Sequence, residues 1–193
     1  DDRPYEGDFY GLGRVFPHPL SGGLSGPGPQ FHSAVAVSPF MNDILVQLAK
    51  SVIDGEKLGK DDAADLLSVS FSSVDLVGHI YGPFSWEMQD AMVRLDKALT
   101  ELIAAAERAA GGRSNLLIVV SADHGTTPIA EELAGAGLPG VRITGTAIEQ
   151  FVAGELRNRS GGGELVIGVE EGELYLSPKA IGDRKIDPVA ARR

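Results

Sequence analysis

Two pairs of side chains in this sequence have the chemistry of metal ligands. The first pair is Asp75 and His79, and the second is Asp123 and His124. A carboxylate together with an imidazole, in a chain without cysteine, is the ligand set of a hydrolytic zinc site or a mixed divalent site. Each pair follows a short apolar run that predicts a β-strand. We therefore interpret these four residues as candidate metal ligands.

The spacing within each pair allows it to bind a metal. Asp75 and His79 are four positions apart, so both side chains lie on one face of a helical turn. Asp123 and His124 are adjacent, but where a strand turns into a loop they can diverge and bind one ion or bridge toward two. Gly125 suits such a tight exit. Simpler interpretations stay open for each residue, as a turn residue, a capping residue or a hydrogen-bonded core imidazole.

Other residues are weaker candidates. His18, between two prolines, and His32 could be further ligands, although a loop histidine is more often only exposed. Ser72, Ser73 and Thr126 could act as nucleophiles near the metals, but no histidine lies in a recognisable motif to serve as their base. We interpret these three as neighbours of the metal ligands. We assign neither a catalytic nucleophile nor a substrate-binding residue in this chain.

A strand, helix and strand unit is predicted to position the ligands. Residues 66–71 predict a buried strand, and residues 75–83 predict the loop that leaves it. Ser85 can cap the following helix, whose apolar stripe continues until Gly111-Gly112. Residues 116–121 predict a second, parallel strand, because they are apolar on consecutive positions. Both ligand pairs then lie at the carboxyl ends of parallel strands, where open α/β sheets bind their ligands.

The flanking sequence completes an α/β prediction. Ser38-Pro39 favours a helix start, with the helix running to about Asp54 and stopped by Gly55. A further helix is predicted over 146–157, and two short strands over 164–168 and 173–177, around the turn Glu170-Glu171-Gly172. We expect a mostly parallel sheet flanked by helices, in a single partial domain over residues 1–193. Its expected parts are a loop-rich entry over 1–37, the metal-ligand core over 38–130, and a helix with short strands over 131–193.

Composition excludes several classes of partner. The chain has 193 residues, 43% of them hydrophobic, and a formal net charge of −10. This acidic balance argues against a nucleic-acid-binding surface and against an anionic membrane surface as partner, since both need a basic face. No apolar run approaches the roughly 20 residues that span a bilayer, and no secretory leader opens the sequence. The lack of cysteine excludes disulfides and leaves the compartment open.

The combined motifs resemble those of a known enzyme family. The segment Val69-Ser70-Phe71-Ser72-Ser73-Val74-Asp75-Leu76-Val77-Gly78-His79 is followed by Gly82-Pro83, Ser85, Glu87, Asp90, Arg94-Leu95-Asp96 and then Ser121-Ala122-Asp123-His124-Gly125. This pattern resembles the alkaline phosphatase superfamily, in its type I phosphodiesterase and nucleotide pyrophosphatase branch, and most of all the phosphodiesterase-like alkaline phosphatases. Residues from about 38 to 130 carry the resemblance.

The resemblance implies a two-metal phosphate-ester hydrolase. Asp75 and His79 would hold one ion, and Asp123 and His124 the other, with zinc as the expected metal. A small phosphate ester would bridge the ions, and a covalent phosphoryl-enzyme would form on a Ser or Thr nucleophile. The resemblance also implies an alkaline phosphatase-like fold and a periplasmic or secreted location.

The sequence departs from the family pattern at both ends. The family's nucleophile and a further metal-binding Asp lie upstream of the motifs, and a final His-Gly ligand lies downstream, but no histidine follows His124 here. We therefore expect an internal or truncated part of such an enzyme, nearly inactive alone. Alternatives are a sulfatase, phosphonate hydrolase or mutase of the same superfamily, or a non-catalytic binding module.

Overall fold

The computed structural model describes residues 3, 5–21, 24–159, 162–170, 172–187 and 189. It divides into two compact units, Asp1–Ala136 and Gly137–Arg193, and each is described by itself. Two details of the sequence predictions lie outside the described residues, namely Gly22-Gly23 in the entry loop and Glu171 in the predicted turn. The expectation that residues 1–193 form one partial domain stays a prediction.

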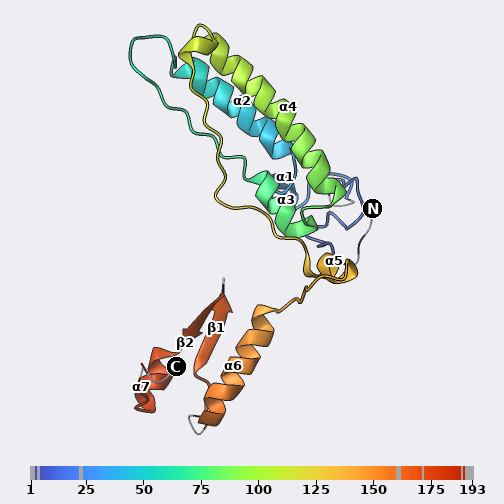
Figure 1. The fold of residues 1–193 in the computed structure, drawn as a ribbon, viewed down its shortest axis with the longest axis vertical. Coiled ribbons are helices and arrows are strands. Elements are labelled where there is room, and N and C mark those ends of the chain that lie inside the picture. The colour runs from blue at the N-terminus through green and yellow to red at the C-terminus, as the bar shows by residue number, and fades with distance from the viewer. Residues whose placement is uncertain are drawn as a thin grey trace. The chain divides into compact units, whose positions relative to one another are not determined.

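The first unit is helical, with long coil segments between its helices (Figure 1). Helix α2 packs along α4, and the shorter α3 packs against α4 as well. Two small apolar clusters form its core, one around Val77, Tyr81 and Met88 and the other around Leu12 and Ala34. The helices of this unit are α1 (Phe31–Ala36), α2 (Phe40–Gly55), α3 (Ser73–Tyr81), α4 (Trp86–Ala109), the 3₁₀ turn η1 (Arg113–Asn115) and α5 (Ala130–Gly135).

The two long helices, α2 and α4, form where the apolar stripes of the sequence predicted them. Helix α4 begins as predicted, because the Ser85 hydroxyl accepts a hydrogen bond from the Met88 amide at 3.1 Å. It ends before Gly111, whose φ of 73° favours glycine. Helix α2 is also confirmed, but the predicted cap is wrong. Pro39 is its N-cap, and the Ser38 hydroxyl instead donates to the Val35 carbonyl at 2.7 Å.

The predicted loop over 75–83 is wrong, since most of it belongs to helix α3. Val77 and Tyr81 are four positions apart and both nearly fully buried, and Val74 and Ile80 pack against the same cluster. This apolar face covers the start of α4, which stabilises the helix. The helix stops at Gly82, whose φ is 87°. The first ligand pair therefore lies within a helix and not in a loop.

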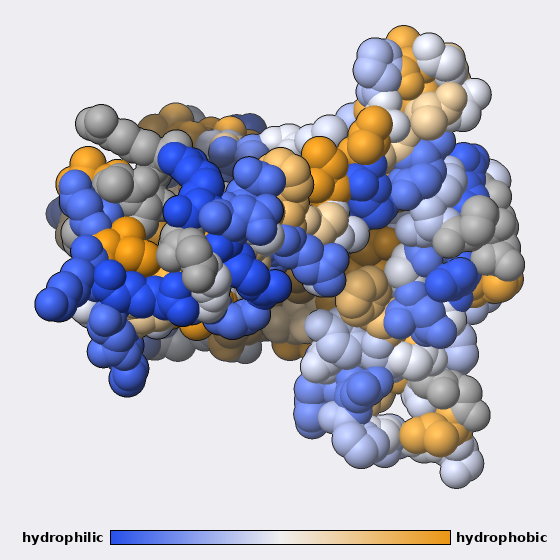
Figure 2. Space-filling model, turned by 90° about the horizontal axis from the view of Figure 1, so that it is seen from below, coloured by the Kyte–Doolittle hydropathy of each residue, from blue (hydrophilic) through white to orange (hydrophobic). Residues whose placement is uncertain are grey.

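The predicted strands over 66–71 and 116–121 are not formed in this structure. Both segments are coil in Figure 1, and the one sheet among the described residues pairs β1 with β2. A strand needs a hydrogen-bonded neighbour, and none of the described segments supplies one. Several of their apolar side chains consequently face solvent, with Leu66 92% and Leu117 87% exposed. Hydrophobic residues, drawn in orange, also reach the surface shown in Figure 2. The parallel sheet is thus absent from the described residues.

The second unit contains a helix and an antiparallel hairpin. Helix α6 (Gly145–Arg159) packs against β1 (Val166–Glu170), which pairs antiparallel with β2 (Glu173–Leu176). A short helix, α7 (Pro178–Asp183), follows. The predicted helix and both predicted strands of this part are confirmed, with bounds shifted by a few residues. In the described parts of the chain, no helix combines the length and apolar character needed to cross a membrane.

Candidate metal centre

Helix α3 presents the first ligand pair on one face. Asp75 lies in its first turn and His79 in its last. The Asp75 Oδ1 atom lies 3.4 Å from His79 Nε2, as the four-residue spacing predicts. The two side chains are 40% and 70% exposed, respectively. Neither is therefore a core residue, and the interpretation of His79 as a buried imidazole is wrong.

The second pair joins the first through Asp75. His124 Nε2 lies 3.6 Å from Asp75 Oδ1 and 3.7 Å from Asp123 Oδ2. The His79 and His124 rings are 6.5 Å apart, edge to face. Asp75 therefore contacts an imidazole from its own helix and another from the segment that follows residues 116–121. The structure brings the four predicted ligands together in one open cluster.

Glycines of α3 allow the second segment to approach the helix. A Cβ atom added at Gly78 would lie 3.1 Å from both Thr126 Oγ1 and Met88 Cε. One added at Gly82 would lie 2.4 Å from Ile129 Cδ1. Thr126 and Ile129 thus occupy the space that larger residues at these two positions would need. Because Thr126 lies two residues after His124, this close approach fixes where the second ligand pair meets α3.

Gly78→Ala is expected to destabilise the first unit. Alanine normally stabilises a helix interior relative to glycine by about 0.5–1 kcal/mol. At Gly78 the added methyl group must displace Thr126 or Met88, at a cost of about 1–3 kcal/mol for overpacking. Urea unfolding should show a net loss of up to about 2 kcal/mol. The matched control is Gly154→Ala in α6, where nothing lies within 4 Å of the added Cβ, so it should gain stability. A gain at both positions would contradict the prediction.

The distance between the ligand atoms of Asp75 and His79 fits tetrahedral zinc coordination. Ligands about 2.0–2.1 Å from a tetrahedral zinc ion are separated from one another by about 3.3 Å. The closest donor pair, Asp75 Oδ1 and His79 Nε2, has a separation of 3.4 Å. Within the described ranges, however, no group of three or more His, Asp or Glu side chains is arranged to hold an ion. The described residues therefore do not form a complete ligand shell for an ion in this structure.

The electrostatics of the cluster favour a cation. Hydrogen bonding of His124 to the Gly125 carbonyl, followed by the charges of Asp123 and Asp75, raises the pKa of His124 above its usual value. Two carboxylates therefore attract positive charge to a surface that is open to water. A histidine must be neutral to bind a metal, so a zinc ion would compete with this proton.

The weaker candidates do not join the cluster. His18 uses both ring nitrogens elsewhere, at the Leu12 carbonyl and at Glu87, and the His32 ring lies against Phe31. Ser73 is 2% exposed, and its hydroxyl has no hydrogen-bond partner among the described residues. The Ser72 hydroxyl pairs with that of Ser70 at 3.1 Å. Of the candidate nucleophiles, Thr126 is the one packed against α3. The close approach of Thr126 to Gly78 was not predicted, although a glycine between the candidate ligands Asp75 and His79 could have indicated it.

Comparison with known proteins identifies the family. Residues 25–140 match the type I phosphodiesterase / nucleotide pyrophosphatase family. The chain belongs to this family. The match covers the whole of the ligand cluster and helices α2 to α4. It confirms the alkaline phosphatase superfamily, which the sequence motifs indicated.

The phosphodiesterase family members that resemble this chain include alkaline phosphatases. The alkaline phosphatase PafA of Elizabethkingia meningoseptica is 30% identical over 156 residues, which are 79% of this chain and 28% of that protein. The alkaline phosphatase PhoV of Synechococcus elongatus is 33% identical over 171 residues, or 88% of this chain and 26% of that protein. The crystal structure of wild-type PafA superposes with a TM-score of 0.83 at 26% identity, covering all of this chain and 36% of the PafA chain.

These comparisons define the fold and the extent of the match. The chain has the fold of the corresponding part of an alkaline phosphatase. It spans 36% of the chain in the PafA structure, and the matched regions cover 28% and 26% of the two curated relatives. The two relatives described above are alkaline phosphatases by name, which supports a hydrolase family for this chain.

Proposed function

We propose that this chain is the metal-ligand part of a two-metal phosphate-ester hydrolase of the alkaline phosphatase and phosphodiesterase type. The observation that carries the proposal is the contact of Asp75 with His79 and His124, from two segments that are distant in sequence. Asp75 and His79 would hold one divalent ion, and Asp123 and His124 the other, with zinc expected at both. When bound there, such ions would supply Lewis-acid chemistry to a phosphate ester and to the hydroxyl that attacks it.

This chain's own residues supply position and charge in the proposed reaction. Helix α3 fixes the first pair, and the packing of Thr126 on Gly78 sets the second pair beside it. The carboxylates supply the negative charge that retains cations. The nucleophile that would carry the covalent phosphoryl group, and the residues that would bind the small ester, belong in our proposal to sequence outside these residues.

The exposed extended segments support a longer enzyme. Residues 66–71 and 116–121 lead directly into the ligand pairs and leave apolar side chains such as Leu66 and Leu117 in solvent. Large exposed apolar surfaces in natural proteins are generally covered by a partner or another segment. We infer that in the longer protein these segments become neighbouring strands of a mostly parallel sheet. We place that protein in the periplasm or outside the cell on the family resemblance alone.

Zinc titration of the chain tests the proposed site. Complete structural sites bind zinc with about 10–16 kcal/mol. Shells with two protein ligands should bind more weakly, with dissociation constants of about 1–100 µM, or roughly 5–8 kcal/mol. Calorimetry of the metal-free chain should show this weak binding. Asp75→Asn should weaken it at least about tenfold, because it removes a charged ligand oxygen that lies beside both imidazoles.

Asp43→Asn is the matched control for this titration. Asp43 is also an exposed aspartate in the first turn of a helix, α2. Its substitution should leave zinc affinity unchanged. If both variants weakened zinc binding equally, the affinity would depend on net charge alone, which would contradict a site at Asp75. Tight binding of two ions would contradict the incomplete shells.

A further inference from the structure

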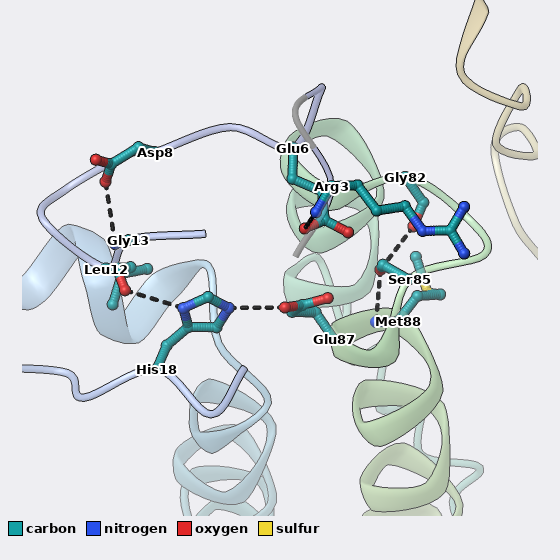
Figure 3. Close-up of polar contacts among 10 residues, drawn as sticks. All are labelled: Arg3, Glu6, Asp8, Leu12, Gly13, His18, Gly82, Ser85, Glu87 and Met88. Atoms are coloured by element: carbon teal, nitrogen blue, oxygen red, sulfur yellow. Dashed lines mark hydrogen bonds and ion pairs between the residues drawn. The ribbon is translucent and has the colours of Figure 1, made fainter. Parts of the chain in front are cut away.

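A buried histidine and glutamate pair connects the N-terminal segment to α4. His18 Nε2 lies 2.8 Å from Glu87 Oε1, and His18 Nδ1 lies 2.9 Å from the Leu12 carbonyl (Figure 3). The two side chains are only 10% and 5% exposed. The proposed hydrolase mechanism uses neither residue. A buried, titratable pair of this kind needs its own explanation.

The hydrogen bonds of His18 require a proton between the two side chains. A carbonyl oxygen can only accept, so His18 Nδ1 must carry a hydrogen to bond Leu12. The neutral imidazole then has a lone pair on Nε2, which would repel a carboxylate of Glu87. The 2.8 Å contact therefore holds a second proton, and the pair is stable as long as that proton is present. The other oxygen of Glu87, Oε2, has no hydrogen-bond partner among the described residues.

The same histidine contacts the end of the ligand helix. Its ring stacks on Tyr81 with a centroid distance of 4.8 Å, and Tyr81 is the last residue of α3, two positions after His79. Two further contacts join the N-terminal segment to this end of the helix. The Gly7 amide donates to the Ile80 carbonyl at 3.0 Å, and Leu12 belongs to a cluster that includes Ile80.

We propose that His18 and Glu87 form a proton-dependent latch that holds the C-terminal end of α3 against the N-terminal segment and α4. Helix α3 carries Asp75 and His79, so loss of the latch proton loosens the element that positions them. The latch itself rests on geometry alone, and its consequence for metal binding rests on the proposed function. His18 and Glu87 are positioning residues in this scheme.

The charges around His18 fix the direction of the pH dependence. Glu6 comes from the N-terminal segment and Glu87 from α4, and the stacked Tyr81 phenol of α3 also feels the charge of Asp8. Burial opposes a charge on His18 and lowers its pKa, but the bonds to Glu87 and Leu12 and the charges of Glu87 and Glu6 outweigh burial. The pKa of His18 is therefore raised above its usual value. Its stabilisation is complete below about pH 6.5 and is lost as pH rises through the raised value.

Two substitutions should each remove this pH dependence. In Glu87→Gln, the amide can donate to the Nε2 lone pair of neutral His18, so no extra proton is needed. In His18→Gln, a permanent amide hydrogen can face Glu87. Proton NMR should show His18 of the wild-type chain titrating above about pH 6.5. In Glu87→Gln its proton affinity should fall about tenfold or more.

Hydrogen exchange of the α3 amides tests the positioning role. After correction for the intrinsic exchange rate, protection of α3 in the wild type should fall several-fold as His18 loses its proton. It should stay constant with pH in both variants. The matched control is His32→Gln, which changes an exposed histidine of α1 and should keep the wild-type pH dependence. The latch would be overturned if Glu87→Gln left the titration of His18 unchanged. It would also be overturned if the protection of α3 did not change as His18 loses its proton.

Discussion

Asp123→Ala in the longer enzyme is expected to lower zinc-dependent hydrolysis of 4-nitrophenyl phosphate by about three orders of magnitude or more. By the family resemblance, Asp123 would hold the ion that activates the nucleophile. Its carboxylate lies 3.7 Å from His124, and its removal leaves that ion with one ligand from this chain. The effect on kcat should exceed that on KM, because the ion acts on the developing charge of the reaction.

The control for this variant is Asp183→Ala. Asp183 forms an exposed ion pair with Lys179 on α7, at the four-residue spacing of a helix. Such surface pairs contribute about 0–1 kcal/mol, so the variant should retain wild-type activity. Excess zinc should partly restore Asp123→Ala if the loss comes from weakened metal binding. Activity of Asp123→Ala within tenfold of wild type would contradict its assignment as a ligand.

The helices were predictable from sequence because their signals are local. The apolar stripe of α4, its Ser85 cap and its glycine stop all lie within the helix or next to it. Helix α3 was not predicted because Gly78 and the polar residues Asp75 and His79 interrupt its apolar pattern. Its buried face also depends on contacts with α4 and the N-terminal segment. Short helices such as α1 and α5 have too few residues for a periodic signal.

Strands are a different case, because their stability depends on distant partners. Residues 66–71 and 116–121 have strand-like sequences, but no ladder forms without neighbours to accept and donate the backbone hydrogen bonds. The ligand cluster was predictable in part, since the four-residue spacing placed Asp75 beside His79. The two pairs were expected together because of parallel strand ends and the motif resemblance, and the structure brings them together without forming those strands. The His18 and Glu87 pair was not predictable, because its hydrogen bond joins residues 69 positions apart.

The isolated chain is expected to show no zinc-dependent hydrolysis of 4-nitrophenyl phosphate above background. Phosphoryl transfer by this scheme needs a positioned nucleophile together with both ions, and loss of one member of such a unit removes nearly all of the rate. The Ser73 hydroxyl is buried, and no histidine lies in a recognisable sequence motif that would make it a base for Thr126. The longer enzyme, with upstream and downstream sequence included, should be active under the same conditions.

The contrary outcome has a specific meaning. Substantial activity of the isolated chain that is lost in Ser72→Ala or Thr126→Val would show that the nucleophile lies within these residues. Ser72 directly precedes α3 and Thr126 packs against Gly78, so both hydroxyls are near the ligand helix. Activity that survives both substitutions and also survives Asp75→Asn would instead come from a contaminating phosphatase, because Asp75 contacts both imidazoles of the cluster. The three variants together therefore distinguish a nucleophile in this chain from the incomplete site proposed for it.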